Sequence, residues 1–191
     1  MSVERRPIVA IIGSGSANHG NVRLAHALGA LVAREGFHLL TGGGAGVMAD
    51  ASRGFTGVDG RPGICIGIIP KAVEEEGPKK GYPNDWVELP IYTHLAGEGG
   101  PASPSSRNPI NVWSAAKVIA LAGGGGTIAE VTLAVEAGKP VLVVQDLEYL
   151  DAEADFRRAL QGLRCGYCVI DRRSGRLEVE DCLAEIEAFL R

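Results

Sequence analysis

A short apolar run that ends in four consecutive glycines constrains the fold of this chain more than any other feature. Residues 118–122 are uniformly apolar, residues 123–126 are all glycine, and a helical pattern follows from Thr127. Four residues without a Cβ let a ligand approach the backbone closely. The helix that follows directs its free N–H groups and the positive end of its dipole at the same turn. The pattern therefore predicts a buried strand, a turn that binds phosphate or another anion, and a helix.

The same order of apolar strand and amphipathic helix recurs along the chain. Strands are predicted over residues 7–12, 37–40, 64–69, 86–90, 118–122, 141–144 and 167–170, the third of them stopped by Pro70. Helices are predicted over residues 21–34, 47–54, 109–116 and 180–190, and after Thr127. Uniformly apolar strands that alternate with helices indicate a parallel sheet with helices on both faces. We therefore expect an α/β fold with a doubly wound sheet, built as a single domain from residues 1–191.

Two further glycine-rich turns follow predicted strands. One spans residues 13–16 and the other residues 42–46. The first turn lacks the third glycine of the dinucleotide fingerprint, and no acidic residue ends the next strand, so NAD binding is not expected. Carboxyl ends of parallel strands share one edge, so we expect all three turns to line one ligand site. The candidate ligand-binding residues are Gly13, Ser14, Gly15, Ser16, Gly42, Gly43, Gly44, Gly46, Val47, Met48, Gly123, Gly124, Gly125, Gly126 and Thr127.

Glu130 has two interpretations. With Thr127 as N-cap, Glu130 stands at the third helical position of a capping box, which is a purely structural role. The same carboxylate lies at the mouth of the predicted anion site. There it would stabilise positive charge on a bound sugar phosphate or position a water molecule.

Arg107 also has two interpretations. Asn108 fits the N-cap position with Pro109 in the first turn, which places Arg107 just outside a helix. A lone arginine at the end of a loop is usually solvated. An arginine fixed beside a helix N-terminus near the ligand edge grips phosphate or carboxylate with two hydrogen bonds.

Composition and charge narrow the classes of function. A net charge of −4 leaves no basic footprint for nucleic acid. No secretory signal is visible, and no run approaches the roughly 18 apolar residues of a membrane span, so we expect a cytoplasmic protein. The four histidines are scattered and the pair Cys165 and Cys168 has no second pair, so no metal site is predicted and the cysteines are expected to be ordinary thiols.

Residues 71–106 form a long region of surface and rim loops in this interpretation. The charged and turn-rich residues 71–86 predict a solvated surface loop. Residues 96–106 are rich in glycine, proline and serine and predict a mobile loop.

Three motifs in this order resemble the LOG superfamily. They are Gly123-Gly124-x-Gly126-Thr127-x-x-Glu130, Gly42-Gly43-Gly44-x-Gly46-Val47-Met48, and an arginine 23 residues before the glutamate. The resemblance covers roughly residues 7 to 145. It implies a Rossmann-like fold, a dimer or larger homo-oligomer, and cleavage of a nucleoside 5′-monophosphate to base and ribose 5-phosphate. It also implies that Arg107 and Glu130 are catalytic and that residues 123–127 hold the phosphate.

The chain departs from these enzymes at several positions. Ala122 stands where their motif begins with proline, and Val131 stands where they carry a second glutamate. Arg107 is followed by Asn108-Pro109, whereas the arginine of the enzymes lies within a helix. The chain is similar in these respects to a sister branch, the molybdenum cofactor carrier proteins, which share the Ala129-Glu130-Val131 pattern and bind a pterin phosphate without turnover.

Two functional hypotheses follow, both with a small phosphorylated ligand as partner. In the first, the chain is a phosphoribohydrolase that needs no cofactor, in which Arg107 orients the ligand and Glu130 stabilises charge at C1′. In the second, the chain is a molybdenum cofactor carrier or a nucleotide sensor. The molybdenum cofactor is then cargo, and Glu130 serves mainly as a helix cap.

Overall fold

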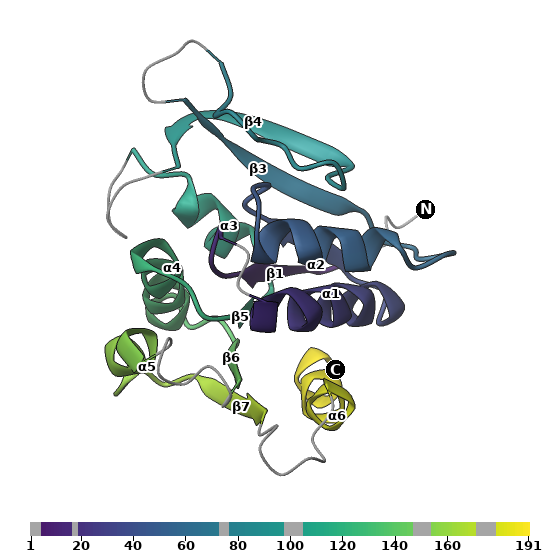
Figure 1. Ribbon diagram of the computed structural model, residues 1–191, viewed down its shortest axis with the longest axis vertical. Coiled ribbons are helices and arrows are strands. Elements are labelled where there is room, and N and C mark those ends of the chain that lie inside the picture. The colour runs from purple at the N-terminus through teal and green to yellow at the C-terminus, as the bar shows by residue number, and fades with distance from the viewer. Residues whose placement is uncertain (1–4, 17–18, 73–76, 98–104, 147–153, 171–178) are drawn as a thin grey trace.

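The computed structural model describes residues 5–16, 19–72, 77–97, 105–146, 154–170 and 179–191. Seven strands form one sheet, with helices on both of its faces (Figure 1). The strands are β1 (Ile8–Ile12), β2 (His38–Thr41), β3 (Cys65–Lys71), β4 (Leu89–Ala96), β5 (Lys117–Ala120), β6 (Val141–Asp146) and β7 (Gly166–Ile170). The helices are α1 (His19–Arg34), α2 (Val47–Thr56), α3 (Asn108–Ser114), α4 (Gly125–Glu136), α5 (Ala154–Leu160) and α6 (Val179–Leu190).

The order of the strands places the predicted turns side by side. The sheet runs β4-β3-β2-β1-β5-β6-β7, and every neighbouring pair is parallel. The chain builds outward from β1 in one direction, then returns to add β5 on the other side of β1. The topological switch point therefore lies between β1 and β5, where ligands bind in open sheets of this kind. The predicted α/β, doubly wound, Rossmann-like fold is confirmed.

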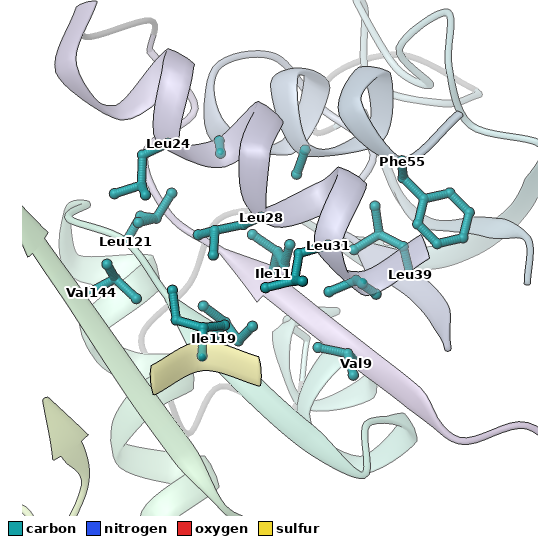
Figure 2. Packing of buried hydrophobic residues seen from close by; sticks show 14 of the residues in the cluster. Val9, Ile11, Leu24, Leu28, Leu31, Leu39, Phe55, Ile119, Leu121 and Val144 are labelled. Atoms are coloured by element: carbon teal, nitrogen blue, oxygen red, sulfur yellow. The ribbon is translucent and has the colours of Figure 1, made fainter. Parts of the chain in front are cut away.

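Two apolar layers enclose the sheet. Helices α1, α2 and α6 cover one face, and α3, α4 and α5 cover the other. Along β1, Val9 and Ile11 point into the first layer, whereas Ala10 and Ile12 point into the second. This alternation is why the strand is apolar at every position. Figure 2 shows the first layer, in which leucines of α1 meet side chains of β1, β2 and β5.

Helices α1 and α2 pack backbone to backbone. A Cβ on Gly29 would overlap the carbonyl oxygen of Ala51, and a Cβ on Gly54 would overlap that of His26. Two glycines therefore allow the close approach of these helices. The contact fixes the start of α2, and with it the glycine-rich turn that precedes α2.

Apart from shifts of a few residues at the ends of elements, the structure differs from the predicted strands and helices as follows. Strand β3 continues through Pro70 to Lys71, because β2 pairs only with residues 65–67 and a register shift with β4 accommodates the proline. Strand β4 spans Leu89–Ala96 rather than residues 86–90. Helix α5 was not predicted. The predicted mobile loop at 96–106 lies largely outside the described residues. No helix in the described ranges is long and apolar enough to cross a bilayer.

Candidate functional site

The backbone of Ser14 ties the three glycine-rich turns together. Its N–H donates to the carbonyl of Ala122 at the end of β5 (3.1 Å), and its carbonyl accepts from the N–H of Val47 at the start of α2 (3.0 Å). Its hydroxyl lies 2.8 Å from that of Ser16. The turns after β1, β2 and β5 therefore meet at one edge of the sheet, as the topology requires.

These turns border a cavity of about 200 Å³, which we call the α4 cavity. Its walls include ten of the predicted site residues: Gly13, Ser14, Gly15, Gly42, Met48, Arg107, Gly124, Gly126, Thr127 and Glu130. Its walls also include five residues that were not among the predicted site residues: Ile12, Tyr82, Gly97, Asn108 and Asn111. Arg107, Glu130 and most of the predicted ligand-binding residues that carry a polar side chain therefore line the same cavity.

The remaining predicted residues do not line the cavity, and most of them shape the turns around it. Gly43 and Gly46 have φ angles of +75° and +64°, a region that favours glycine. Gly44 gives room to the ring of Tyr82, and Gly123 gives room to the side chain of Thr127. Val47 is buried in the apolar layer beneath α1 and α2. Ser16 and Gly125 also lie outside the cavity wall.

Helix α4 begins three residues earlier than the capping-box interpretation requires. Its first residue is Gly125, its N-cap is Gly124, and no side chain caps it. Thr127 is therefore not the N-cap, and the predicted capping box is wrong. Within the described part of the chain, the N–H groups of Gly125 and Gly126 have no hydrogen-bond partner. The N-terminus of α4 thus offers free donors and its positive dipole end beside the cavity.

Gly124 and Gly125 are not required by the packing of the protein. A Cβ built on either residue would meet nothing within 4 Å. Neither residue has a positive φ. Their missing side chains leave open space in front of the helix rather than room for another part of the chain.

Arg107 is buried at the cavity wall, not solvated in a loop. It is the N-cap residue of α3, one position nearer the helix than predicted, and Asn108 is the first helical residue rather than the cap. Only 6% of Arg107 is exposed, and its Nε has no hydrogen-bond partner among the described residues. The guanidinium fills the space that a Cβ on Gly42 would occupy. A buried N–H group without a hydrogen-bond partner, such as the Nε–H of Arg107, is costly unless a ligand supplies the partner.

Glu130 is also buried, with 7% of its surface exposed. Asn111 Nδ2 donates to Glu130 Oε1 at 2.7 Å, so the carboxylate belongs to a side-chain network and not to a helix cap. Burial raises the pKa of Glu130, although the charge of Arg107 and the hydrogen bond from Asn111 both oppose that rise. The interpretation of Glu130 as a helix cap is therefore wrong.

Asn111 completes this polar wall. Its Oδ1 is buried without a hydrogen-bond partner in the described structure. The residue stands four positions after Arg107 on α3, so both lie on one face of the helix. That spacing is a signal that could have identified Asn111 from the sequence, although Asn111 was not among the predicted site residues. Arg107, Asn111 and the N-terminus of α4 together present donors and one free acceptor to the cavity.

Part of the predicted surface loop packs against the second glycine-rich turn. The backbone N–H of Asn84 donates to the carbonyl of Gly43 (2.8 Å), and Asn84 Nδ2 donates to that of Gly44 (2.9 Å). These bonds hold Tyr82 at the cavity wall. The interpretation of residues 71–86 as a purely solvated loop is wrong for this part. No local pattern in the sequence points to Tyr82, because its contact with Gly44 joins residues far apart in the chain.

The described residues hold no cluster of three or more His, Cys, Asp or Glu side chains that would suit a metal ion. Cys65 and Cys165 are free thiols, and burial raises the pKa of Cys65 to about 11. The side chains of Cys168 and Cys182 lie outside the described residues.

Several known proteins are similar to this chain in sequence and fold along nearly its whole length. The molybdenum cofactor binding protein of Rippkaea orientalis is 31% identical, with 99% of this chain and 100% of that protein covered and a TM-score of 0.66. The molybdenum cofactor carrier protein of Chlamydomonas reinhardtii is 32% identical, with 97% and 99% covered and a TM-score of 0.65. A protein of Archaeoglobus fulgidus is 31% identical over 84% of this chain and 93% of its own length. The SLOG cluster4 family model matches residues 6–164, and the chain belongs to that LOG-like family, in a branch that resembles the molybdenum cofactor carriers.

Proposed function

We propose that the α4 cavity binds the phosphate group of a small ligand, held by the N-terminus of α4 and by Arg107. The observation that carries this proposal is the buried guanidinium of Arg107, whose Nε has no partner among the described residues. A phosphate supplies two acceptors in the geometry that a guanidinium prefers. The free N–H group of Gly126, a residue of the cavity wall, adds a donor for a remaining oxygen.

We propose further that the ligand is the molybdenum cofactor and that the chain carries it as cargo. The similarity to the two molybdenum cofactor proteins supports this, because it extends over nearly all of this chain. The cofactor is a phosphorylated pterin, so its phosphate would occupy the site just described. In this role the protein binds and releases the cargo without changing it.

A second candidate function is hydrolysis of a nucleoside 5′-monophosphate to base and ribose 5-phosphate. One observation favours it: Arg107 and Glu130 line the same cavity. Arg107 would orient the phosphate, and Glu130 would stabilise positive charge at C1′ and align the attacking water.

One experiment separates these functions. Isothermal titration calorimetry would measure binding of molybdopterin and of common nucleoside 5′-monophosphates, and chromatography would detect any released base. We expect molybdopterin to bind and Arg107→Met to weaken it by at least about a hundredfold. Arg164→Met removes the same charge from an exposed position away from the cavity and serves as the control.

The outcomes divide cleanly. Molybdopterin binding that Arg107→Met leaves unchanged would remove the proposed phosphate site. Base release that Glu130→Gln abolishes would establish the hydrolase instead of the carrier. No binding of either class of ligand would overturn both functions.

We also propose that the chain assembles with copies of itself. Leu89, Ile91 and Tyr92 are exposed apolar residues on β4, an edge strand of the sheet. Such a row on an edge strand favours association. Light scattering after size-exclusion chromatography would give the mass, and a monomer at every concentration would contradict this proposal.

A further inference from the structure

A second hollow adjoins the α4 cavity. It is an open groove of about 500 Å³, and we call it the Tyr82 groove. It is lined by small residues at the start of α2 and by the segment between β3 and β4: Ala45, Ala49, Gly81, Tyr82, Pro83, Asn84, Asp85 and Trp86. Tyr82 lines both hollows and so forms the wall that they share.

The aromatic side of the Tyr82 groove is held firmly in place. Asn84 donates two hydrogen bonds to carbonyls of the Gly43–Gly44 turn, and Asn84 Oδ1 accepts from the N–H of Trp86 at 3.2 Å. The guanidinium of Arg53 lies 5.9 Å from the centre of the Trp86 ring. These contacts restrain the segment that carries Tyr82 and Trp86, and the ring of Trp86, before any ligand binds, which reduces the entropy lost on binding.

The opposite side of the groove is made of small side chains. Ala49 belongs to the first turn of α2, and Ala45 lies just before that helix. A wall of small residues that faces Tyr82 and Trp86 leaves a space suited to a flat ring, since aromatic side chains stack on flat rings.

Charge favours the α4 cavity over this groove for the phosphate end of a ligand. Asp85 is an acidic residue of the groove lining, and Lys79 Nζ and the guanidinium of Arg53 lie 5.9 Å from the ring centres of Tyr82 and Trp86. The α4 cavity holds the buried guanidinium of Arg107, whose Nε has no partner among the described residues, so the phosphate is attracted to the cavity. The carboxylate of Asp85 also accepts hydrogen bonds from ring N–H groups.

We infer that the Tyr82 groove is a second subsite, which binds the fused heteroaromatic ring of the ligand whose phosphate occupies the α4 cavity. This inference rests on the proposed function, because it takes the phosphate site as given. Trp86 and Tyr82 stack on the ring, and Ala49 leaves the space that the ring fills. The substrate class is thus a phosphate ester with a flat, fused ring that bears N–H donors.

The test compares two phosphate esters, one with a ring and one without. Calorimetry would measure the affinity of 6-hydroxymethylpterin phosphate and of methyl phosphate for the full chain. Neither probe has an N-glycosidic bond, so hydrolysis of that bond does not disturb the measurement. We expect the pterin ester to bind about tenfold more tightly or better, as base stacking on aromatic side chains does elsewhere.

Two variants locate the source of that difference. Trp86→Leu removes a stacking surface, and Ala49→Leu fills the groove from α2 without disturbing the aromatic segment. Each should reduce the affinity for the pterin ester to near that for methyl phosphate and leave methyl phosphate binding unchanged. Trp113→Leu is the matched control, because Trp113 is 60% exposed on α3 and lines neither hollow.

Each result has a definite meaning. Equal affinity for the two esters, or a difference that persists in both groove variants, overturns the ring subsite while the phosphate site stands. If neither ester binds, or if Arg107→Met leaves the affinity for both esters unchanged, the proposed phosphate site and this inference are both overturned.

Discussion

Two lysine side chains have hydrogen-bond partners at the amino ends of the strands, which we call the amino edge of the sheet, but some buried polar groups at the carboxyl ends, the carboxyl edge, are unpaired among the described residues. At the amino ends of the strands, Lys117 Nζ donates to the carbonyls of Phe189 and Leu190 at the end of α6 (2.6 and 2.8 Å), and Lys139 Nζ donates to that of Ala115 (2.6 Å). At the carboxyl ends, the Nε of Arg107 has no partner in the described structure. A buried polar group without a partner costs about 1–3 kcal/mol. The two lysines that attach helices to the sheet therefore have hydrogen-bond partners, whereas a donor of Arg107 at the cavity has none in the described structure.

The largest effect on stability is expected at the satisfied edge. Lys117→Met removes both hydrogen bonds to the last turn of α6. Charged hydrogen bonds of this kind contribute about 2 kcal/mol, so the melting temperature should fall by about 4–8 °C in thermal denaturation followed by circular dichroism. Affinity for a phosphate ester should not change. A loss of phosphate affinity in Lys117→Met would show that the two edges are coupled, which contradicts the division between a structural edge and a binding edge.

The carboxyl edge should show the reverse behaviour. Gly124→Ala adds a methyl group to open space at the cavity wall, where no protein atom lies within 4 Å. We expect the affinity for methyl phosphate to fall about tenfold, because the methyl group occupies ligand space. The melting temperature should fall by only a few degrees at most, because alanine is a poorer N-cap than glycine but meets no other part of the protein.

Gly125→Ala is the matched control for this variant. Its Cβ position is equally open, but Gly125 does not line the cavity. The two alanine variants should therefore differ in the affinity for methyl phosphate measured by calorimetry. Equal affinities in both variants and in the unaltered chain would mean that the phosphate does not approach Gly124.

Lys139→Met allows the two lysines at the amino ends of the strands to be compared with each other. Its Nζ makes a short bond to Ala115 and a longer one, 3.3 Å, to the carbonyl of Trp113. The free energy of unfolding should fall by about 1 kcal/mol, less than for Lys117→Met, because the longer bond is exposed and weaker. Urea denaturation of both variants measures the difference, and the opposite order would contradict this ranking.

The smallest effect is expected for Glu130→Gln, because the amide oxygen of the new side chain still accepts the hydrogen bond from Asn111. Burial raises the pKa of Glu130 above its usual value of 4.5, so the folded chain holds this proton more tightly than the unfolded chain. The stability that this provides is complete below about pH 4.5 and is lost as the pH rises through the raised pKa. The melting temperature of Glu130→Gln relative to the unaltered chain should therefore increase from pH 4.5 upward and then level off.

Glu136→Gln, on the exposed part of α4, controls for the loss of a carboxylate. A pH-independent difference for Glu130→Gln would show that this carboxyl does not change its proton affinity on folding.

The sequence predicted the sheet and its glycine-rich edge because those features are local. Continuous apolar runs mark strands buried on both faces, and each of the three turns follows such a run directly. The start of α4 was misplaced for a local reason too. Thr127 and Glu130 have the spacing of a capping box, but the preceding glycines let the helix begin at Gly125.

The polar network of the site was largely beyond prediction because its contacts join distant residues. Asn111 meets Glu130 across 19 positions, and Asn84 meets Gly44 across 40. Nothing near Tyr82 in the sequence marks it as a wall residue. Arg107 was recognised as a candidate, yet its burial depends on the space that Gly42 leaves open, which no pattern in the sequence reveals.

The attachment of Asn84 has a consequence for how such a chain diversifies. Asn84 binds backbone carbonyls of the Gly43–Gly44 turn, and a carbonyl is present whatever side chain stands there. Two hydrogen bonds from Asn84 thus hold this segment in place, and neither of them involves the side chains of Tyr82, Asp85 or Trp86. Substitutions at these neighbours would leave the segment in place but change the shape of the Tyr82 groove, so related chains could accept different rings without a change in the turn beneath the groove.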